Sequence, residues 1–207
     1  MNAPILVISE DPALRQIIDD AGVALQRPTV VVRADAIAGL PGTEPPACLV
    51  ADTDSDPHDL DQSIRLARQR GFEGDIILVG NASATDMATR CIRISASDFI
   101  AKPVKSADLF RALRRADVRQ RILDNPAPYV AAELTDVYGL TQRESDVLTC
   151  VLSGHASKDI ARSLNISPRT VEVYRSSMMK KLGARSVPEL LPLTVKEVVR
   201  IVLKARI

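Results

Sequence analysis

Short apolar runs in the first half of the chain each lead to a residue that could take part in chemistry. These residues are Ser9, Glu10, Asp52, Gly80 and Lys102, which end or follow the runs 5–8, 48–51, 76–79 and 99–100. Two of them, Glu10 and Asp52, are carboxylates, and carboxylate oxygens are suitable ligands for Mg²⁺.

Strands and helices are predicted to alternate along residues 1–124, which would bring these residues together. Apolar runs at 5–8, 29–32, 48–51, 76–79 and 99–100 predict strands, and amphipathic stretches between them predict helices. Runs that are apolar throughout are typical of a parallel sheet covered by helices on both faces. We therefore expect an α/β, doubly wound, flavodoxin-like sheet of five parallel strands, with functional groups just beyond the carboxyl ends of the strands.

The last part of the chain predicts short helices with explicit start signals. Thr141-x-x-Glu144 is a capping box that opens one helix. Ser157 is expected to cap a second helix, and Ser167, followed by a proline, to cap a third that runs to Leu182. The gap between the second and third helices is very short, so together they predict a helix-turn-helix.

The third of these helices has an apolar side and a polar side. Its inward positions, at helical spacing, are Val171, Met178 and Leu182. In the major groove a glutamate can accept from cytosine N4, a valine can contact a thymine methyl, and a serine hydroxyl can also meet base edges. The side chains better suited to phosphates are Lys158, Thr170, Arg175 and Lys180. The outward stripe, its flanks and one lysine of the preceding helix give the candidate DNA-binding residues: Lys158, Arg169, Thr170, Glu172, Val173, Arg175, Ser176 and Lys180.

A proline-rich break separates the two parts. An Arg-rich helix predicted from Ser106 to Leu123 is followed by Asn125-Pro126-Ala127-Pro128, and proline disfavours the helical conformation in the residue before it. We therefore predict an α/β domain over residues 1–124, a linker over 125–134 and an all-α helix-turn-helix domain over 135–207.

Composition narrows the class of function. Residues 1–133 carry a net charge of −4 and residues 134–207 one of +5, which favours a polyanionic partner for the second part. The three cysteines are widely spaced among apolar residues, which is typical of reduced thiols in a cytoplasmic protein and not of a disulfide or zinc site. Apolar runs are too short to span a membrane, and the start of the chain lacks the pattern of a signal peptide, so no membrane partner is expected.

One known family resembles both parts of the chain. The stretch from Leu140 to Leu191 resembles the LuxR-type helix-turn-helix of NarL/FixJ response regulators, above all in the run ISPRTVEVYRSSMMKKL. Residues 1–124, with DFIAKP at 98–103, are similar to the receiver domain of that family. The resemblance implies a two-component transcription regulator, not an enzyme, that binds double-stranded DNA as a homodimer and takes its signal from a sensor histidine kinase. It also implies base contacts by Glu172, Val173 and Ser176.

The first part departs from the receiver pattern where the chemistry lies. The positions that correspond to a receiver's active site are Ser9, Glu10, Asp52, Gly80, Phe99 and Lys102. By this resemblance Asp52 is the candidate phosphoacceptor, but a serine stands where one metal-binding carboxylate is usual, and Gly80 replaces a Thr or Ser. By the same resemblance the candidate Mg²⁺ ligands are Glu10, Asp52 and the main-chain carbonyl of Asp54, with water at the remaining positions. Glutamate is, however, one methylene longer than aspartate, and Mg²⁺ tolerates misplaced ligands poorly. We therefore predict an atypical receiver in which phosphorylation at Asp52 is weak or absent.

Three other functions stay open on the residues alone. A conventional phospho-activated response regulator has the same two domains. Asp52-Thr53-Asp54 resembles the Asp-x-Asp of haloacid-dehalogenase-type phosphatases, although Gly80 stands where such an enzyme needs a hydroxyl. A protein adaptor that has lost DNA binding is the third alternative.

The C-terminal tail predicts a packing surface. Pro192 should interrupt a helix that begins near Ser186, and Thr194-x-x-Glu197 should open a new one. The apolar stripe of this last helix consists of Val195, Val198, Val199 and Val202. We expect it to serve core or dimer packing.

Overall fold

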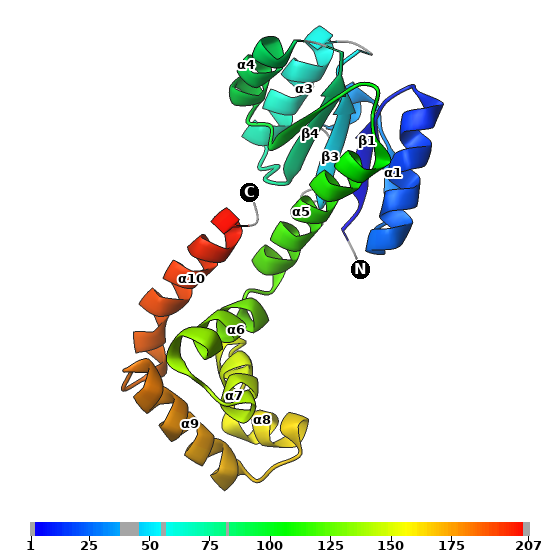
Figure 1. The fold of residues 1–207 in the computed structure, drawn as a ribbon. Helices are drawn as coiled ribbons and strands as arrows, with labels where there is room; N and C mark the ends of the chain where they lie inside the picture. The colour runs from blue at the N-terminus through cyan, green and yellow to red at the C-terminus, as the bar shows by residue number, and fades with distance from the viewer. Residues whose placement is uncertain (1–2, 38–45, 55–56, 82, 205–207) are drawn as a thin grey trace. The chain divides into compact units, whose positions relative to one another are not determined.

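The chain forms two compact units, residues 1–120 and 121–207 (Figure 1). The described buried apolar residues of each unit pack among themselves, in two clusters in the first unit and one in the second. The computed structural model describes residues 3–37, 46–54, 57–81 and 83–204. Within these residues, no helix combines the length and the apolar character needed to cross a membrane.

The first unit is built on a parallel sheet. Its described strands follow the order β2-β1-β3-β4-β5 and are β1 (Ile5–Ile8), β2 (Thr29–Val31), β3 (Cys48–Asp52), β4 (Asp75–Gly80) and β5 (Asp98–Ala101). Neighbouring strands pair in parallel throughout, with Asp52 of β3 opposite Val79 of β4. The order reverses between β1 and β3, and such a switch point leaves a crevice at the carboxyl ends of the strands. Ser9 and Asp52 lie at this point.

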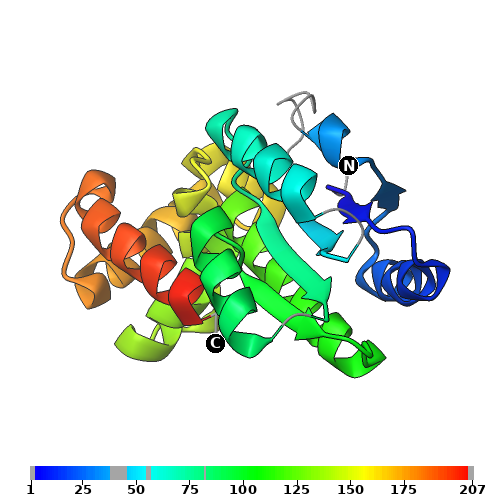
Figure 2. The same ribbon diagram turned by 90° about the horizontal axis from the view of Figure 1, so that it is seen from above.

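Alternate residues of the strands face opposite sides of the sheet and build two cores. One core joins Val7 and Val50 to α1 (Pro12–Leu25) and α5 (Ser106–Asp124). The other joins Leu6 and Leu49 to three helices, which are α2 (Ala34–Ile37), α3 (Pro57–Gln69) and α4 (Ala84–Ile94). Figures 1 and 2 show α3 and α4 on one side and α1 on the other. The prediction of a doubly wound α/β sheet is confirmed.

The second unit is helical. Its described elements are α6 (Ala127–Tyr138), α7 (Gln142–Leu152), α8 (Ser157–Leu164), α9 (Pro168–Leu182), a 3-10 turn at Val187–Leu190 and α10 (Leu191–Lys204). Asn165 ends α8 in the left-handed conformation, with φ 54°, and the Ser167 hydroxyl accepts from the N–H of Thr170 at the start of α9. The short connection confirms the predicted helix-turn-helix.

Residues 125–134 differ from the predicted linker. Most of them belong to α6, whose residues Val130, Ala131 and Leu134 are buried in the second core. Pro126 and Pro128 stand at the start of this helix, where a missing N–H costs no helical hydrogen bond. The proline pair therefore marks the beginning of a helix and not an extended connection.

The C-terminal helix also differs from its prediction. α10 begins at Leu191 and holds Pro192 in its first turn, and the Thr194 hydroxyl donates back to the Leu190 carbonyl at 2.9 Å instead of opening a new helix. The predicted apolar stripe is divided, because Val198 packs against the core while Val199 is exposed.

Candidate functional sites

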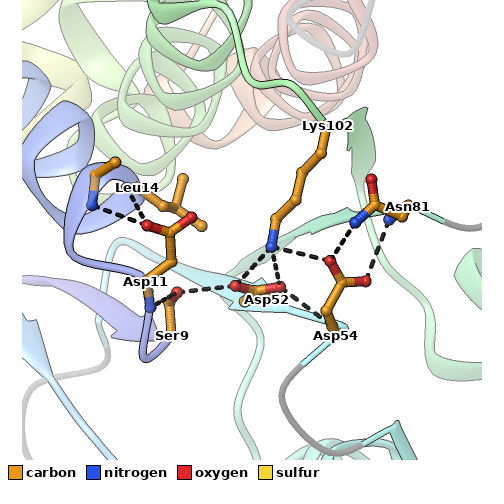
Figure 3. A network of polar contacts seen from close by, with 8 residues as sticks. Ser9, Asp11, Leu14, Asp52, Asp54, Asn81 and Lys102 are labelled. Carbon is orange, nitrogen blue, oxygen red and sulfur yellow. Dashed lines mark hydrogen bonds and ion pairs between the residues drawn. The ribbon is translucent and has the colours of Figure 1, made fainter.

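The carboxyl ends of β1, β3 and β5 bring Ser9, Asp52 and Lys102 together (Figure 3). The Ser9 hydroxyl donates to Asp52 Oδ2 at 2.9 Å, and Lys102 Nζ lies 2.9 and 3.0 Å from the two Asp52 oxygens. The N–H of Asp54 adds a hydrogen bond to Asp52 Oδ1 at 3.1 Å. Because Asp52 is only 2% exposed, these donors take the place of water around its carboxylate.

Lys102 is shared with a second carboxylate. Its Nζ lies 2.9 Å from Asp54 Oδ2, and Asp54 in turn accepts from the N–H of Asn81 at 3.2 Å and from Asn81 Nδ2 at 2.7 Å. The hydrogen bond from Lys102, more than those from Asn81, holds the pKa of Asp54 below its ordinary value. Partial burial opposes the charge of Lys102, but its hydrogen bonds to Asp52 and Asp54 outweigh that effect and raise its pKa. The lysine therefore bridges two carboxylates as a cation.

The two predicted carboxylate ligands of Mg²⁺ have different surroundings. Glu10 is exposed, and its neighbour Asp11 caps α1 by accepting from the N–H of Ala13 at 2.9 Å. In the part of the chain that the structure describes, no three His, Cys, Asp or Glu side chains gather closely enough to hold a metal ion. Both Asp52 oxygens already accept hydrogen bonds and Lys102 pairs with Asp52 and Asp54, so a Mg²⁺ at this edge of the sheet would compete with these donors for the Asp52 oxygens.

The space beside Gly80 is filled from the neighbouring strand. A Cβ on Gly80 would lie 1.9 Å from Thr53 Oγ1 and 3.2 Å from Asp54 Oδ1. Thr53 is 4% exposed, and its N–H donates to the Val79 carbonyl at 2.8 Å. The hydroxyl expected from the end of β4 is thus replaced in space by one that follows β3. Phe99, half-buried on β5, packs against the core on the α3 and α4 side.

A buried carboxylate holds α9 against α7. Glu144 is 3% exposed and closes the predicted capping box with Thr141, whose N–H donates to Oε2 at 2.7 Å. It also accepts from two side chains of α9, Ser177 Oγ at 2.6 Å and Lys181 Nζ at 2.7 Å. The hydrogen bonds from Lys181, Ser177 and Thr141 together lower the pKa of Glu144 to about 2. Glu144 therefore remains charged and fixes the position of α9.

The two sides of α9 are arranged as the spacing predicts. Val171, Met178 and Leu182 are buried in the core of the second unit. Thr170 and Arg175 are partly buried, and Val173 is 62% exposed. The other candidate DNA-binding residues are all exposed, namely Lys158, Arg169, Glu172, Ser176 and Lys180.

Ser157 has a role that sequence reasoning missed. Ala156, and not Ser157, stands at the N-cap of α8. The Ser157 hydroxyl instead donates to Glu172 Oε1 at 2.6 Å and accepts from Arg175 Nη1 at 3.1 Å. It therefore orients two candidate DNA-binding side chains of α9, a role that only the crossing of the two helices reveals. The Thr170 hydroxyl lies 2.8 Å from Ser167 Oγ and belongs to the start of the helix.

Comparison with known proteins agrees with both units. Residues 138–194 match the family described as bacterial regulatory proteins, luxR family. The chain is 31% identical over 191 residues to the transcriptional regulatory protein FixJ of Azorhizobium caulinodans, covering 90% of this chain and 89% of that protein. It is 29% identical over 198 residues to FixJ of Bradyrhizobium diazoefficiens, covering 93% and 94%.

A solved structure matches over the same length. The crystal structure of full-length FixJ from B. japonicum is 26% identical, covers 94% of this chain and 97% of its own, and superposes with a TM-score of 0.52. A receiver-like sheet followed by a LuxR-type helix-turn-helix is therefore common to the sequences and the folds. The chain belongs to the NarL/FixJ family of response regulators.

Proposed function

We propose that this response regulator binds duplex DNA with α9 in the major groove and controls transcription from the cytoplasm. The observation that carries the proposal is the division of α9 into a side packed in the core and a side that exposes Glu172, Val173 and Ser176. A helix of this kind behind a short turn is the recognition helix of a helix-turn-helix. The relatives described as transcriptional regulatory proteins support this function, and family membership makes the chain a regulator and not an enzyme.

The side chains of α9 divide into two roles. Glu172, Val173 and Ser176 read base edges, because a carboxylate, a methyl-bearing side chain and a hydroxyl can distinguish base pairs in the major groove. The hydrogen bond from Ser157 to Glu172 supports this role, since it orients the carboxylate before DNA arrives. The side chains for phosphates, which set affinity without reading sequence, are Lys158, Arg169, Thr170, Arg175 and Lys180.

The protein acts as a homodimer in this proposal. A single small domain binds weakly, and joining two raises affinity through effective concentration. α10 offers a surface for pairing, because four large apolar residues recur at intervals of four along it and are all more than half exposed: Leu191, Val195, Val199 and Leu203. A contiguous apolar stripe on a surface helix is a common feature of protein interfaces.

The receiver accepts a phosphoryl group at Asp52 weakly or not at all. A cavity of about 420 Å³, lined by Ser9, Glu10 and Asp52 among others, gives a small donor access to the carboxylate. Lys102 divides its charge between Asp52 and Asp54, and Ser9 supplies a hydroxyl where the family pattern has a metal-binding carboxylate. A sensor histidine kinase and Mg²⁺ remain the partner and cofactor of the alternative, a conventional phospho-activated regulator.

DNA binding is tested with the full-length chain and a pool of random duplexes. Selected duplexes should carry two half-sites centred about 10 base pairs apart, one for each recognition helix. Fluorescence anisotropy on a selected duplex should give an affinity that falls steeply with salt, because phosphate contacts release counterions. Equal affinity for every duplex would overturn base reading by α9, and binding to none at low salt would favour the protein adaptor.

Phosphorylation is tested with acetyl phosphate and Mg²⁺. Intact mass measurement should find a small fraction of adduct that is absent from Asp52→Asn, and light scattering should find the same dimer fraction before and after treatment. A stoichiometric adduct on Asp52 that drives dimerisation would overturn the atypical receiver.

A further inference from the structure

We propose that Thr53 and Asp54, which border the end of β3, replace the side chain that β4 lacks at Gly80. Thr53 fills the space of that side chain, and Asp54 connects Asn81, the residue after β4, to Lys102. The inference deepens the proposed function, since it concerns how the receiver transmits the state of Asp52.

The space beside Gly80 is too small for both side chains. An added Cβ would meet Thr53 Oγ1 at 1.9 Å, and rotating the hydroxyl away would still leave Thr53 Cβ at 3.3 Å. Thr53 is buried and its main chain is bonded to β4, so it has little room to retreat. Thr53 and Gly80 therefore form a complementary pair across two neighbouring strands.

Asp54 connects the acceptor to the start of α4. Polar contacts run without a break from Asp52 to Lys102, from Lys102 to Asp54 and from Asp54 to Asn81 (Figure 3). Asn81 stands just before Ser83, which caps α4 by accepting from the N–H of Asp86. Asn81, the residue that follows β4, is therefore held from the end of β3 by two hydrogen bonds to one carboxylate.

The body of α4 is fixed separately. Asp61 of α3, 5% exposed, accepts from Arg90 Nε at 2.6 Å and from Arg93. Asp54 therefore holds Asn81, whereas Asp61 ties the body of α4 to α3. Negative charge added at Asp52 competes with Asp54 for Lys102, because the attraction of a cation increases with the charge beside it. Lys102, which already contacts both Asp52 oxygens, then gives up Asp54, and the Asp54 carboxylate loses the contact that fixes its position beside Asn81.

The first test is a double-mutant cycle on the complementary pair. Gly80→Ala adds only the Cβ, and Thr53→Ala removes the hydroxyl that it meets. Hydrogen exchange of the β3 and β4 amides in the full-length chain should become at least about tenfold faster in Gly80→Ala, and should return to within about threefold of wild type in the double variant. Additive effects, or a double variant that does not fold, would overturn the pairing of Thr53 with Gly80.

The second test follows the amide of Asn81 by hydrogen exchange. Asp54→Ala removes the acceptor of that amide and should speed its exchange about tenfold, whereas Asp54→Asn keeps an acceptor oxygen and should restore part of the protection. Glu10→Gln, a charge change at the same edge of the sheet, should leave the rate unchanged.

Lys102→Met tests whether Lys102 influences Asn81 through Asp54, or whether the contact between Asp54 and Asn81 is independent of Lys102. Asn81 donates two hydrogen bonds to Asp54, and Lys102 acts on Asn81 through that carboxylate, so Lys102→Met should also speed exchange at Asn81, by about threefold. An unchanged rate at Asn81 in Lys102→Met would overturn the link. All of these rates are measured without DNA, so a failure of DNA binding leaves their interpretation intact.

Discussion

Replacing Glu144 by Gln should loosen the recognition helix. The glutamine keeps the shape of the side chain but removes the charge that Ser177 and Lys181 of α9 bind. Folding lowers the pKa of Glu144 from its ordinary 4.5 to about 2, and this shift corresponds to about 3 kcal/mol of stabilisation of the folded state by the charged form. The Lys181 side chain is 34% exposed, and solvent screening reduces the expected loss to about 2 kcal/mol.

The same pKa fixes how this loss depends on pH. A carboxylate whose pKa is lowered by folding stabilises the folded state above its unfolded pKa, and this contribution disappears as pH falls through the folded pKa. For Glu144 the contribution is complete above 4.5 and declines between 4.5 and about 2. The difference in unfolding free energy between wild type and Glu144→Gln should therefore be largest near neutral pH and shrink in acid.

Tyrosine fluorescence can follow this unit within the full-length chain. All three tyrosines, Tyr129, Tyr138 and Tyr174, lie in residues 121–207, and the chain has no tryptophan. Urea unfolding at neutral and acidic pH would give the free energies, with the exposed Asp136→Asn as control. A loss below about 0.5 kcal/mol near neutral pH, or a loss that does not shrink in acid, would refute the reasoning.

Three further outcomes are expected. Val173→Ala should reduce the preference for one base pair, whereas Lys180→Ala should weaken binding to all duplexes alike and lower the slope of log affinity against log salt concentration by about one. Fluorescence anisotropy on matched and mismatched sites distinguishes the two variants. Equal losses of affinity at both sites for Val173→Ala would contradict its role in base reading. Arg27→Met removes the buried 2.7 Å ion pair with Asp117 and should cost about 3–5 kcal/mol, measured by hydrogen exchange of the first unit. A loss near zero would contradict a stabilising role of this ion pair. Met178→Ala should cost the second unit about 2–5 kcal/mol in tyrosine-monitored unfolding, and a neutral result would contradict its burial.

Elements governed by local signals could be predicted from the sequence. The start of α9 follows from Ser167 because an N-cap and the proline after it act within one turn of helix. Pro126 and Pro128 are also prolines at the start of a helix, yet at these positions the sequence predicts a linker where the structure has α6. A proline in the first turn of a helix and a proline that ends one differ only in the residues after them, and the buried face of α6 is what decides.

Roles that depend on a second element could not be predicted in the same way. The capping box of Glu144 is local, but its bonds to Ser177 and Lys181 exist only because α9 crosses α7. Ser157 likewise matches the pattern of a cap, and only the approach of α9 brings Glu172 to its hydroxyl. Helical periodicity separates the inner and outer sides of a helix but does not say which neighbour each side meets.

The end of β3 shows how a side chain lost on one strand can be supplied by the next. Taken alone, Gly80 indicates a missing hydroxyl. Asp52 lies opposite Val79, however, so the residue after Asp52 lies beside Gly80, and a β-branched Thr53 there occupies the empty volume. Thr53 therefore fills the volume that Gly80 leaves empty, and Asp54 places an additional carboxylate beside Lys102. The weak phosphorylation that we propose then follows from a lysine shared between Asp52 and Asp54, and the exchange rate of the Asn81 amide tests this sharing.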